Sequence, residues 1–182
     1  MINLKLNDAI ILAAGASERL GMPKALIPLN NETLIQVIIK KLQTFNLNII
    51  IVTRLELKEE ITALGEKVVI NLNPEEGRTG SIQCGLKEIQ GKPCMIVPVD
   101  RPGFSLSTIE KLIQTDITSC PSKNGKGGHP VVISVKDCKK ILESDPLTPL
   151  REIIQPLKIE VDDEFLHLNI DYLEDLDELM KM

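Results

Sequence analysis

A glycine-containing segment with two cations follows the first apolar run of the chain. It extends from Leu12 to Lys24 and includes Gly15, Arg19 and Lys24. Small residues let backbone N–H groups approach an anion closely, and open α/β sheets bind ligands at the carboxyl ends of their strands. The spacing matches neither the Walker phosphate-binding loop nor the three-glycine dinucleotide pattern. The segment therefore predicts an anion site of another kind; an ordinary turn with two solvated cations is the alternative.

Aspartates follow two further strand-like segments. Asp100 lies in Val97-Pro-Val-Asp-Arg-Pro-Gly103, and Asp171 ends Asn169-Ile-Asp171. Mg²⁺ takes oxygen ligands and usually keeps only one or two carboxylates from the protein, so a pair at strand ends predicts a magnesium site. The ordinary alternatives are a turn residue at Asp100 and a helix N-cap at Asp171.

Alternating strand and helix patterns would position these residues. The apolar run Ala9–Gly15 favours a strand buried on both faces of a parallel sheet. Asn31 is a candidate N-cap, and Ser107 with Glu110 fits a capping box. The pattern predicts an α/β fold with a doubly wound, mostly parallel sheet flanked by helices. Further apolar runs lie at Asn48–Thr53, Lys67–Asn71 and Cys94–Val99, and helical periodicity lies at Glu32–Phe45, Leu55–Leu64, Ser81–Ile89 and Ser107–Thr115.

The pattern changes after Asp116. A flexible, turn-rich loop is expected at Ser122–Gly128, which we interpret as an active-site loop because too little chain follows for an independent core. Residues 1–182 are therefore expected to form a single domain. The elements expected here are a strand at His129–Ser134, a helix at Lys136–Glu143, short elements at Pro149–Ile154, Lys158–Asp162 and Glu164–Asn169, and an acidic helix at Tyr172–Met180.

The composition excludes several classes of function. The 182 residues are 43% hydrophobic and 26% charged, which is typical of a globular protein. A net charge of −5 and only 2% aromatic residues argue against nucleic-acid binding, since they supply neither a basic field nor stacking platforms. No apolar stretch resembles a signal peptide or membrane span, so a cytoplasmic protein without a membrane partner is expected. Four cysteines without zinc-ligand spacing are expected to be free, mostly buried thiols: Cys84, Cys94, Cys120 and Cys138.

Together, these motifs resemble the small nucleotidyltransferases of molybdenum-cofactor biosynthesis, the cytidylyl- and guanylyltransferase group with the NTP-transferase fold. The resemblance rests on L-A-A-G-x-S-x-R-x-G-x-P-K at Leu12–Lys24, P-x-D-x-P around Asp100, and N-x-D at Asn169–Asp171 before an acidic helix. Two more stretches fit, namely N-x-x-x-G-x-x-x-S-x-x-x-G-L at Asn73–Leu86 and Gly128-His-Pro130. The resemblance extends over essentially the whole chain, with the motifs in the same order.

The resemblance implies a role for each matched residue. Asp100 and Asp171 would hold Mg²⁺, and Arg19, Lys24 and Asp100 would be the catalytic residues. Arg101, His129 and Arg151 would bind the acceptor, the molecule that receives the nucleotidyl group. There are ordinary alternatives for two of them. A Gly-His-Pro segment can simply turn the chain, and a surface salt bridge is the commoner fate of an arginine such as Arg151. The implied nucleotide-binding residues are Leu12, Ala13, Ala14, Gly15, Ala16, Ser17, Arg19, Lys24, Asn73, Gly80 and Ser81, the last in a turn with Gly80.

Four positions depart from the family pattern. Leu20 stands where Met is usual, which is a conservative apolar change. Arg101 occupies a position where a neutral residue is expected, and it adds a positive charge beside the implied metal. Tyr172 and Leu173 replace a common Thr-Pro pair after Asp171, so the metal assignment depends more on Asp100 than on Asp171.

The reaction implied is Mg²⁺-dependent transfer of a nucleotidyl group from CTP to molybdopterin or its molybdenum form, releasing pyrophosphate. The nucleophile is already an anion, which agrees with a chain of two histidines and no Ser/His/Asp or Cys/His pattern. Ala13-Ala14-Gly15 and Gly-His-Pro favour the cytidylyl branch. The alternatives are GTP as donor, or a sugar phosphate or phosphocholine as acceptor.

A different class of function is a non-catalytic nucleotide-binding module that delivers the cofactor to a molybdoenzyme. Retention of Lys24, Asp100 and Asp171 together argues against it, because a binder has little use for two metal carboxylates. A molybdoenzyme or its chaperone is a candidate protein partner of the enzyme as well, and a monomer is the default oligomeric state.

Overall fold

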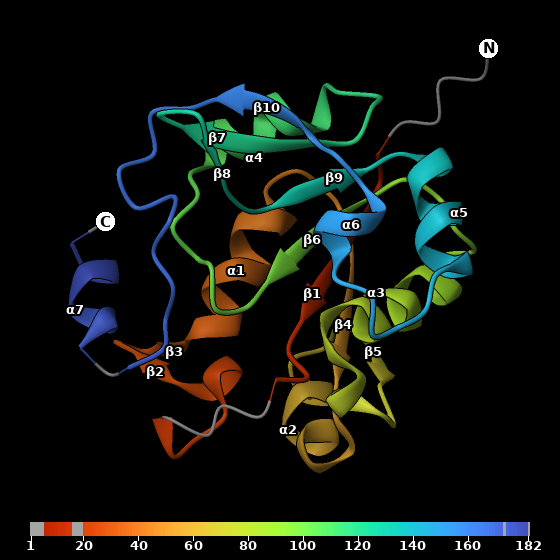
Figure 1. Cartoon of the computed structure of the whole chain (residues 1–182). Helices are drawn as coiled ribbons and strands as arrows, with labels where there is room; N and C mark the ends of the chain where they lie inside the picture. The colour runs from red at the N-terminus through yellow and green to blue at the C-terminus, as the bar shows by residue number, and fades with distance from the viewer. Residues whose placement is uncertain (1–5, 16–19, 173, 182) are drawn as a thin grey trace.

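A twisted β-sheet organises the part of the chain that the computed structural model describes, namely residues 6–15, 20–172 and 174–181 (Figure 1). The strands run in the order β10-β7-β9-β6-β1-β4-β5, and β8 pairs with β7 off this path. β1 pairs in parallel with β4 and β6, while β9 is antiparallel to both neighbours, β6 and β7. The predicted α/β fold with a mostly parallel sheet is confirmed. The strands are β1 (Asp8–Leu12), β4 (Asn48–Thr53), β5 (Lys67–Ile70), β6 (Cys94–Pro98), β7 (Ser119–Lys123), β8 (Lys126–Gly127), β9 (Val131–Ile133) and β10 (Leu157–Glu160).

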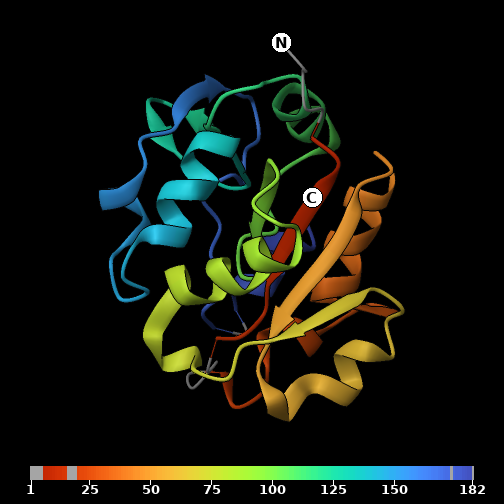
Figure 2. The same cartoon turned by 90° about the vertical axis from the view of Figure 1, so that its right-hand side faces the viewer.

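Helices cover both faces of the sheet. They are α1 (Leu34–Gln43), α2 (Lys58–Thr62), α3 (Gly77–Glu88), α4 (Leu106–Ile113), α5 (Val135–Glu143), α6 (Leu150–Ile153) and α7 (Asp175–Leu179). Ile11 of β1 belongs to the core formed with α1 and α4, whereas Ile10 packs in the core formed with α3 and α5. Figure 2 shows α3 and α5 on one side of β1 and α1 on the other. Successive residues of a strand face opposite sides, so a strand buried on both faces must be apolar throughout.

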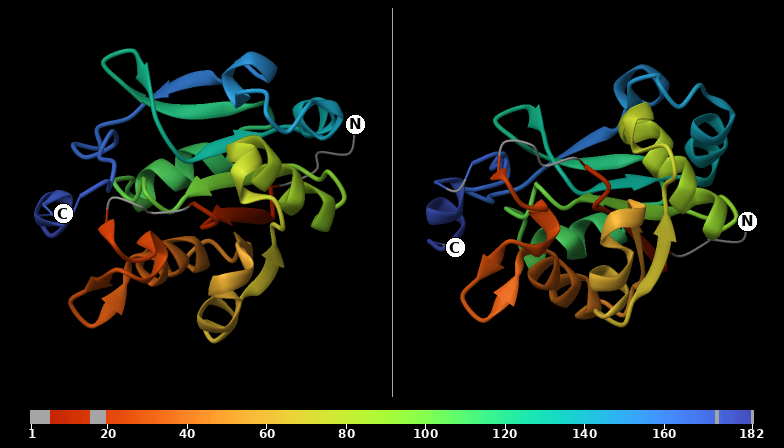
Figure 3. Two further views of the ribbon diagram at one scale, coloured as in Figure 1. Left: turned by 60° about the horizontal axis from the view of Figure 1, so that its bottom comes forward. Right: turned by 90° about the horizontal axis from the view of Figure 1, so that it is seen from below.

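The first long helix starts later than the sequence predicts. Glu32 and Thr33 form β3 (Glu32–Thr33), which pairs with β2 (Pro28–Leu29) in a hairpin that projects beside α1 (Figure 3). Thr33 is the N-cap of α1 and exchanges hydrogen bonds with Gln36 in a capping box. The predicted cap at Asn31 is therefore wrong, because the residues after it pair across the hairpin before the helix begins.

Two further helix starts differ from the expectation. α4 begins after Ser105, whose Oγ accepts a hydrogen bond from the Thr108 N–H at 3.2 Å, so the expected box at Ser107 does not form the cap. α3 begins at Gly77, four residues before the expected start, and Ser81 therefore lies within a helix and not in a turn. A Pro–Glu–Glu 3₁₀ turn over Pro74–Glu76 leads directly into this helix and explains the early start.

In the second half of the chain, two segments differ from the structure that the sequence predicts. The stretch expected to be a loop at Ser122–Gly128 forms a hairpin, because β7 and β8 pair antiparallel through Ser122 and Gly127. The segment Glu164–Asn169 is a turn and coil segment, not a strand. It packs so closely on the loop after β6 that a Cβ on Gly103 would lie 1.9 Å from the Phe165 carbonyl oxygen.

The cysteine expectation is confirmed. All four are free thiols; Cys94, Cys120 and Cys138 are buried and Cys84 is half-buried. Within the described ranges, no helix combines the length and apolar character needed to cross a bilayer.

The contact between Gly85 of α3 and Ile10 of β1 gives a test of the packing. A Cβ on Gly85 would lie 2.7 Å from Ile10 Cγ2, and Ile10 is fully buried. We expect Gly85→Ala to lower the free energy of unfolding by about 1–3 kcal/mol through overpacking. Urea denaturation measures the change.

The matched control is Gly80→Ala in the same helix, where the nearest atoms lie at 3.4 Å. Alanine is a better helix former than glycine, so stability should be unchanged or rise by up to about 1 kcal/mol. Equal stability of the two variants would contradict the close packing of α3 on β1.

Candidate active site

The loops that follow β1 and β6 leave the sheet side by side. Leu12 is in register with Pro98, and the pairing continues beyond the strands because the Val99 N–H donates to the Leu12 carbonyl at 3.1 Å. On the other side, the Ala13 N–H donates to the Val52 carbonyl at 2.8 Å. The first motif and Asp100 are therefore brought together at the carboxyl edge of the sheet, where parallel α/β folds bind ligands.

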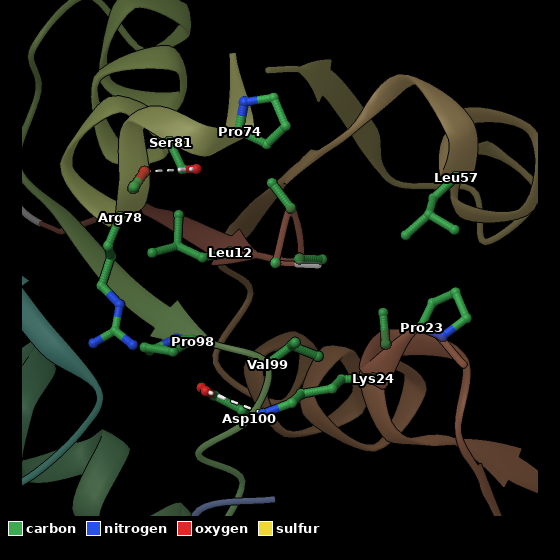
Figure 4. Close-up of a pocket in the computed structure, with 15 residues that line it drawn as sticks. Leu12, Pro23, Lys24, Leu57, Pro74, Arg78, Ser81, Pro98, Val99 and Asp100 are labelled. Carbon is green, nitrogen blue, oxygen red and sulfur yellow. Dashed lines mark hydrogen bonds and ion pairs between the residues drawn. The ribbon is translucent and has the colours of Figure 1, made fainter. Parts of the chain in front are cut away.

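A cavity of about 330 Å³ opens at this edge (Figure 4). We refer to it as the strand-end cavity. Its walls come from the ends of β1 and β6, the start of α3, and the 3₁₀ turn Lys24–Leu26, with Leu57 and Pro74 as apolar contributors. The residues of the cavity that the sequence predicted are Leu12, Ala13, Ala14, Gly15, Lys24, Ser81 and Asp100.

The ammonium of Lys24 lies against two carboxylates. Its Nζ is 2.7 Å from Asp171 Oδ1 and 3.8 Å from Asp100 Oδ2. The three side chains are only 16%, 31% and 21% exposed, so water screens their interaction less than at an open surface. The geometry joins the loop after β1, the end of β6 and the C-terminal segment.

Backbone contacts fix the position of Asp171. The Ile170 N–H donates to the Asp100 carbonyl at 2.9 Å, which ties the two aspartate segments together. Asn169 Nδ2 donates to Asp171 Oδ2, and the Asp171 N–H donates to Asp175 Oδ2 at 2.8 Å. Asp171 is not the N-cap of α7, which is Glu174.

The donor set fits a divalent metal. The two carboxylates already face one cation, the Lys24 ammonium, and Mg²⁺ characteristically takes one or two carboxylates and completes its shell with phosphates and water. The described residues contain no cluster of three or more His, Cys, Asp or Glu side chains arranged for a metal. A site made of Asp100 and Asp171 would therefore need substrate oxygens as well.

The loop after Asp100 is held by a lysine of α1. Lys41 Nζ donates to the Pro102 carbonyl at 3.0 Å and to the Phe104 carbonyl at 2.8 Å, and lies 5.0 Å from the centre of the Phe104 ring. Burial lowers the pKa of Lys41, and the nearby carboxylate of Asp163 opposes that effect. This contact could not be predicted from the sequence, because Lys41 has the pattern of an ordinary residue on a helix surface.

Ser81 is joined to a buried asparagine. Asn71, at the end of β5, donates through Nδ2 to Ser81 Oγ at 3.0 Å and accepts from the Asn73 N–H through Oδ1 at 2.9 Å. Asn71 therefore connects the start of α3 to the loop before it. The sequence signal that could have identified Asn71 is its position as a polar residue at the end of an apolar run.

Some of the predicted nucleotide-binding residues lie elsewhere. Asn73 and Gly80 are not on the wall of the strand-end cavity, and Gly80 faces Glu76 and Pro146 instead. Ala16, Ser17 and Arg19 lie outside the described residues.

A second cavity, of about 760 Å³, lies beside the first, and we refer to it as the outer cavity. Its basic residues are Arg78, His129, Arg151 and Lys158, and its apolar wall includes Val131, Leu147, Leu150 and Ile154. Two of the three predicted acceptor residues, His129 and Arg151, thus share one cavity. Arg101 is not on its wall; its Nη1 donates to the His167 carbonyl at 3.1 Å.

The imidazole of His129 is neutral at physiological pH. Burial, followed by the nearby charges of Arg78 and Arg101, lowers the pKa of His129 to about 4. Its Nδ1 is buried and finds no hydrogen-bond partner among the described residues, and the same holds for Arg101 Nε. The two guanidiniums keep their charge throughout the physiological range, so the positive character of this region does not depend on pH.

Comparison with known proteins identifies the family. A family model described as the MobA-like NTP transferase domain matches residues 9–161. A molybdenum cofactor cytidylyltransferase of Escherichia coli (strain K12) is 27% identical over 177 residues, which are 92% of this chain and 92% of that protein. A probable molybdenum cofactor guanylyltransferase of Clostridium perfringens (strain SM101 / Type A) is 29% identical over 152 residues, or 81% of this chain and 75% of that relative.

A solved structure shares the fold. Rv0371c from Mycobacterium tuberculosis H37Rv, in a complex with manganese, superimposes with a TM-score of 0.73 at 16% identity and covers 96% of this chain and 97% of that one. The family model spans most of the sequence, including β6, most of β1 and all the residues that line the two cavities, whereas Asp171 lies beyond the matched region. The chain therefore belongs to the MobA-like NTP transferase domain family.

Proposed function

We propose that this protein is a Mg²⁺-dependent cytidylyltransferase that transfers CMP from CTP to molybdopterin or its molybdenum form and releases pyrophosphate. The observation that carries the proposal is the cluster of Lys24, Asp100 and Asp171 at the mouth of the strand-end cavity, beside a second, basic cavity. A cation-binding site next to an anion-binding one suits a reaction between two phosphate compounds. The name and coverage of the Escherichia coli relative support the choice of acceptor.

The strand-end cavity would take the nucleotide. Lys24 would contact the triphosphate, and the small residues Ala13 and Ala14 would allow the base and ribose to approach the backbone. Asp100 and Asp171 would hold Mg²⁺, which supplies charge neutralisation on the phosphate oxygens. The manganese complex of the structurally similar Rv0371c supports a divalent metal.

No general base is required on the acceptor side. An oxygen of the acceptor's phosphate is already ionised at neutral pH; it forms a bond to the α-phosphorus, and the bond between that phosphorus and the bridging oxygen breaks, with its electron pair leaving on pyrophosphate. The protein's contribution is then positioning and charge stabilisation. The low pKa of His129 agrees with a positioning role, because a neutral imidazole donates or accepts a hydrogen bond without carrying charge.

The outer cavity would take the acceptor. Arg151 and Lys158 supply charge for a phosphate, while Val131 and Ile154 supply an apolar surface for an uncharged ring system. A sugar phosphate or phosphocholine would make less use of that apolar wall. A GTP-dependent reaction is the second candidate, because the Clostridium perfringens relative is named as a guanylyltransferase.

The carboxylate of Asp100 gives the first test. Asp100→Asn removes one charge from the cation site at nearly constant volume, so we expect kcat for nucleotidyl transfer to fall at least about 100-fold. The matched control is Asp116→Asn, since Asp116 is exposed and lines neither cavity. Activity is measured as pyrophosphate release from CTP in the presence of molybdopterin and Mg²⁺.

Equal activity of the Asp100 variant and wild type would rule out the proposed metal site. A non-catalytic nucleotide-binding module would be indicated if wild type bound CTP but released no pyrophosphate with any acceptor tested.

The choice of base is tested by thermal stabilisation with CTP, GTP, ATP and UTP, each with and without Mg²⁺. A ligand at about 100 times its Kd stabilises the folded state by about 2.7 kcal/mol, which corresponds to roughly 5–10 °C in Tm for a chain of this size. We expect the largest shift with CTP and Mg²⁺. A shift selective for GTP would reassign the protein to the guanylyl reaction.

A further inference from the structure

Arg78 lies where the two cavities meet. Gly77 and Arg78 are the residues common to the walls of the strand-end cavity and the outer cavity. Glycine has no side chain, so within the described part of the chain Arg78 is the only residue whose side chain borders both.

The first turn of α3 holds Arg78 at this boundary. Thr79 Oγ1 donates to the Thr148 carbonyl at 2.7 Å and so ties the turn to the segment that forms the far wall of the outer cavity. Figure 4 shows the Arg78 side chain extending toward the Pro98 side of the strand-end cavity, while Lys24 enters from the opposite side. Two cations therefore approach the same space from different elements.

The guanidinium of Arg78 is available to a ligand. The side chain is exposed, and no hydrogen bond or ion pair joins it to another described residue. Its planar fork of N–H donors suits two oxygens of a phosphate, or one oxygen from each of two phosphates. The donors of Arg78 are thus free to bind an anion that enters either cavity.

The surroundings of Arg78 favour an anion. Arg78 and Arg101 both act on His129 strongly enough to contribute to its low pKa, and Arg151 lies on the same outer cavity. Glu76 is the only carboxylate on that cavity's described wall, and its Oε1 accepts a hydrogen bond from Asn73 Nδ2 at 3.4 Å. On the wall of the outer cavity, positive charges therefore outnumber negative ones.

We propose that Arg78 is a catalytic residue that contacts both reacting phosphates, the phosphomonoester of the acceptor in the outer cavity and the α-phosphate of the nucleotide in the strand-end cavity. This inference rests on the proposed function. As the acceptor oxygen forms its bond to the α-phosphorus and pyrophosphate leaves with the electron pair of the broken bond, two anions must come together. A single guanidinium that touches both offsets their repulsion and fixes their relative orientation.

The test compares Arg78→Gln with Arg78→Lys, Arg151→Gln and Lys87→Gln. Arg151 borders only the outer cavity, and Lys87 is an exposed residue of the same helix that borders neither. Steady-state kinetics with Mg²⁺, CTP and molybdopterin separates kcat from the KM of each substrate. Thermal unfolding checks the fold, and each variant should melt within about 2 °C of wild type.

We expect Arg78→Gln to lower kcat about 100- to 1000-fold, which is the scale of losing one transition-state donor, and Arg78→Lys to restore part of it. Arg151→Gln should raise the KM for molybdopterin with kcat near wild type, and Lys87→Gln should match wild type. A raised acceptor KM in Arg78→Gln with kcat unchanged would overturn the proposal, as would a variant that behaves like Lys87→Gln.

A second measurement does not depend on the identity of the acceptor. Inorganic phosphate is titrated calorimetrically into protein saturated with Mg²⁺ and a non-hydrolysable CTP analogue, or with the GTP analogue if GTP gives the larger thermal shift. Wild type should bind phosphate, and Arg78→Gln should weaken that binding at least about tenfold, because the guanidinium supplies a charged donor to it.

Undiminished phosphate binding in Arg78→Gln, or none in wild type, would overturn the inference. If wild type binds phosphate through Arg78 but transfers no nucleotide to molybdopterin, the choice of acceptor fails while the role of Arg78 stands.

Discussion

The contact of Lys24 with two carboxylates is the interaction on which the candidate site depends. Asp100 and Asp171 lie 71 positions apart in the chain, and two carboxylates held close together repel one another unless a cation lies between them. Lys24 supplies that cation at 2.7 and 3.8 Å. Because the loop after β1, the end of β6 and the C-terminal segment each contribute one of these side chains, the ammonium also links three parts of the chain that are far apart in sequence.

The sheet makes this contact possible. β1 lies between β4 and β6 and is parallel to both, so the chain leaves β1 and β6 at the same edge of the sheet. The two exits are adjacent, because the Val99 N–H still donates to the Leu12 carbonyl. The central strands are apolar on both faces because α1 and α4 cover one side and α3 and α5 the other. Sequence composition in the strands is thus determined by burial, which leaves the residues just beyond their ends free to differ in charge.

The features that could be predicted from the sequence are local, and those that could not depend on distant contacts. The apolar strand β1 and the positions of Lys24 and Asp100 after strand ends follow from patterns within about a dozen residues. The predicted start of α1 is wrong because Glu32 pairs with Leu29 across a hairpin. The segment Glu164–Asn169 has the alternating pattern of a strand, but in the folded chain it forms turn and coil packed against Gly103. Asn71 was missed because its importance lies in the Ser81 hydroxyl that the folded chain places beside it.

The distribution of charge separates the two halves of the site. The chain as a whole carries a net charge of −5, yet the outer cavity presents Arg78, Arg151 and Lys158, whereas the carboxylates lie around Lys24 at the mouth of the strand-end cavity. A cation and an anion are therefore attracted to different places a short distance apart. Since arginine stays charged and His129 stays neutral at physiological pH, this separation of charge does not depend on pH within the physiological range. In the proposed reaction, an anionic acceptor would be drawn to the arginine side, away from the carboxylates that would repel it, and would therefore meet the nucleotide from that side.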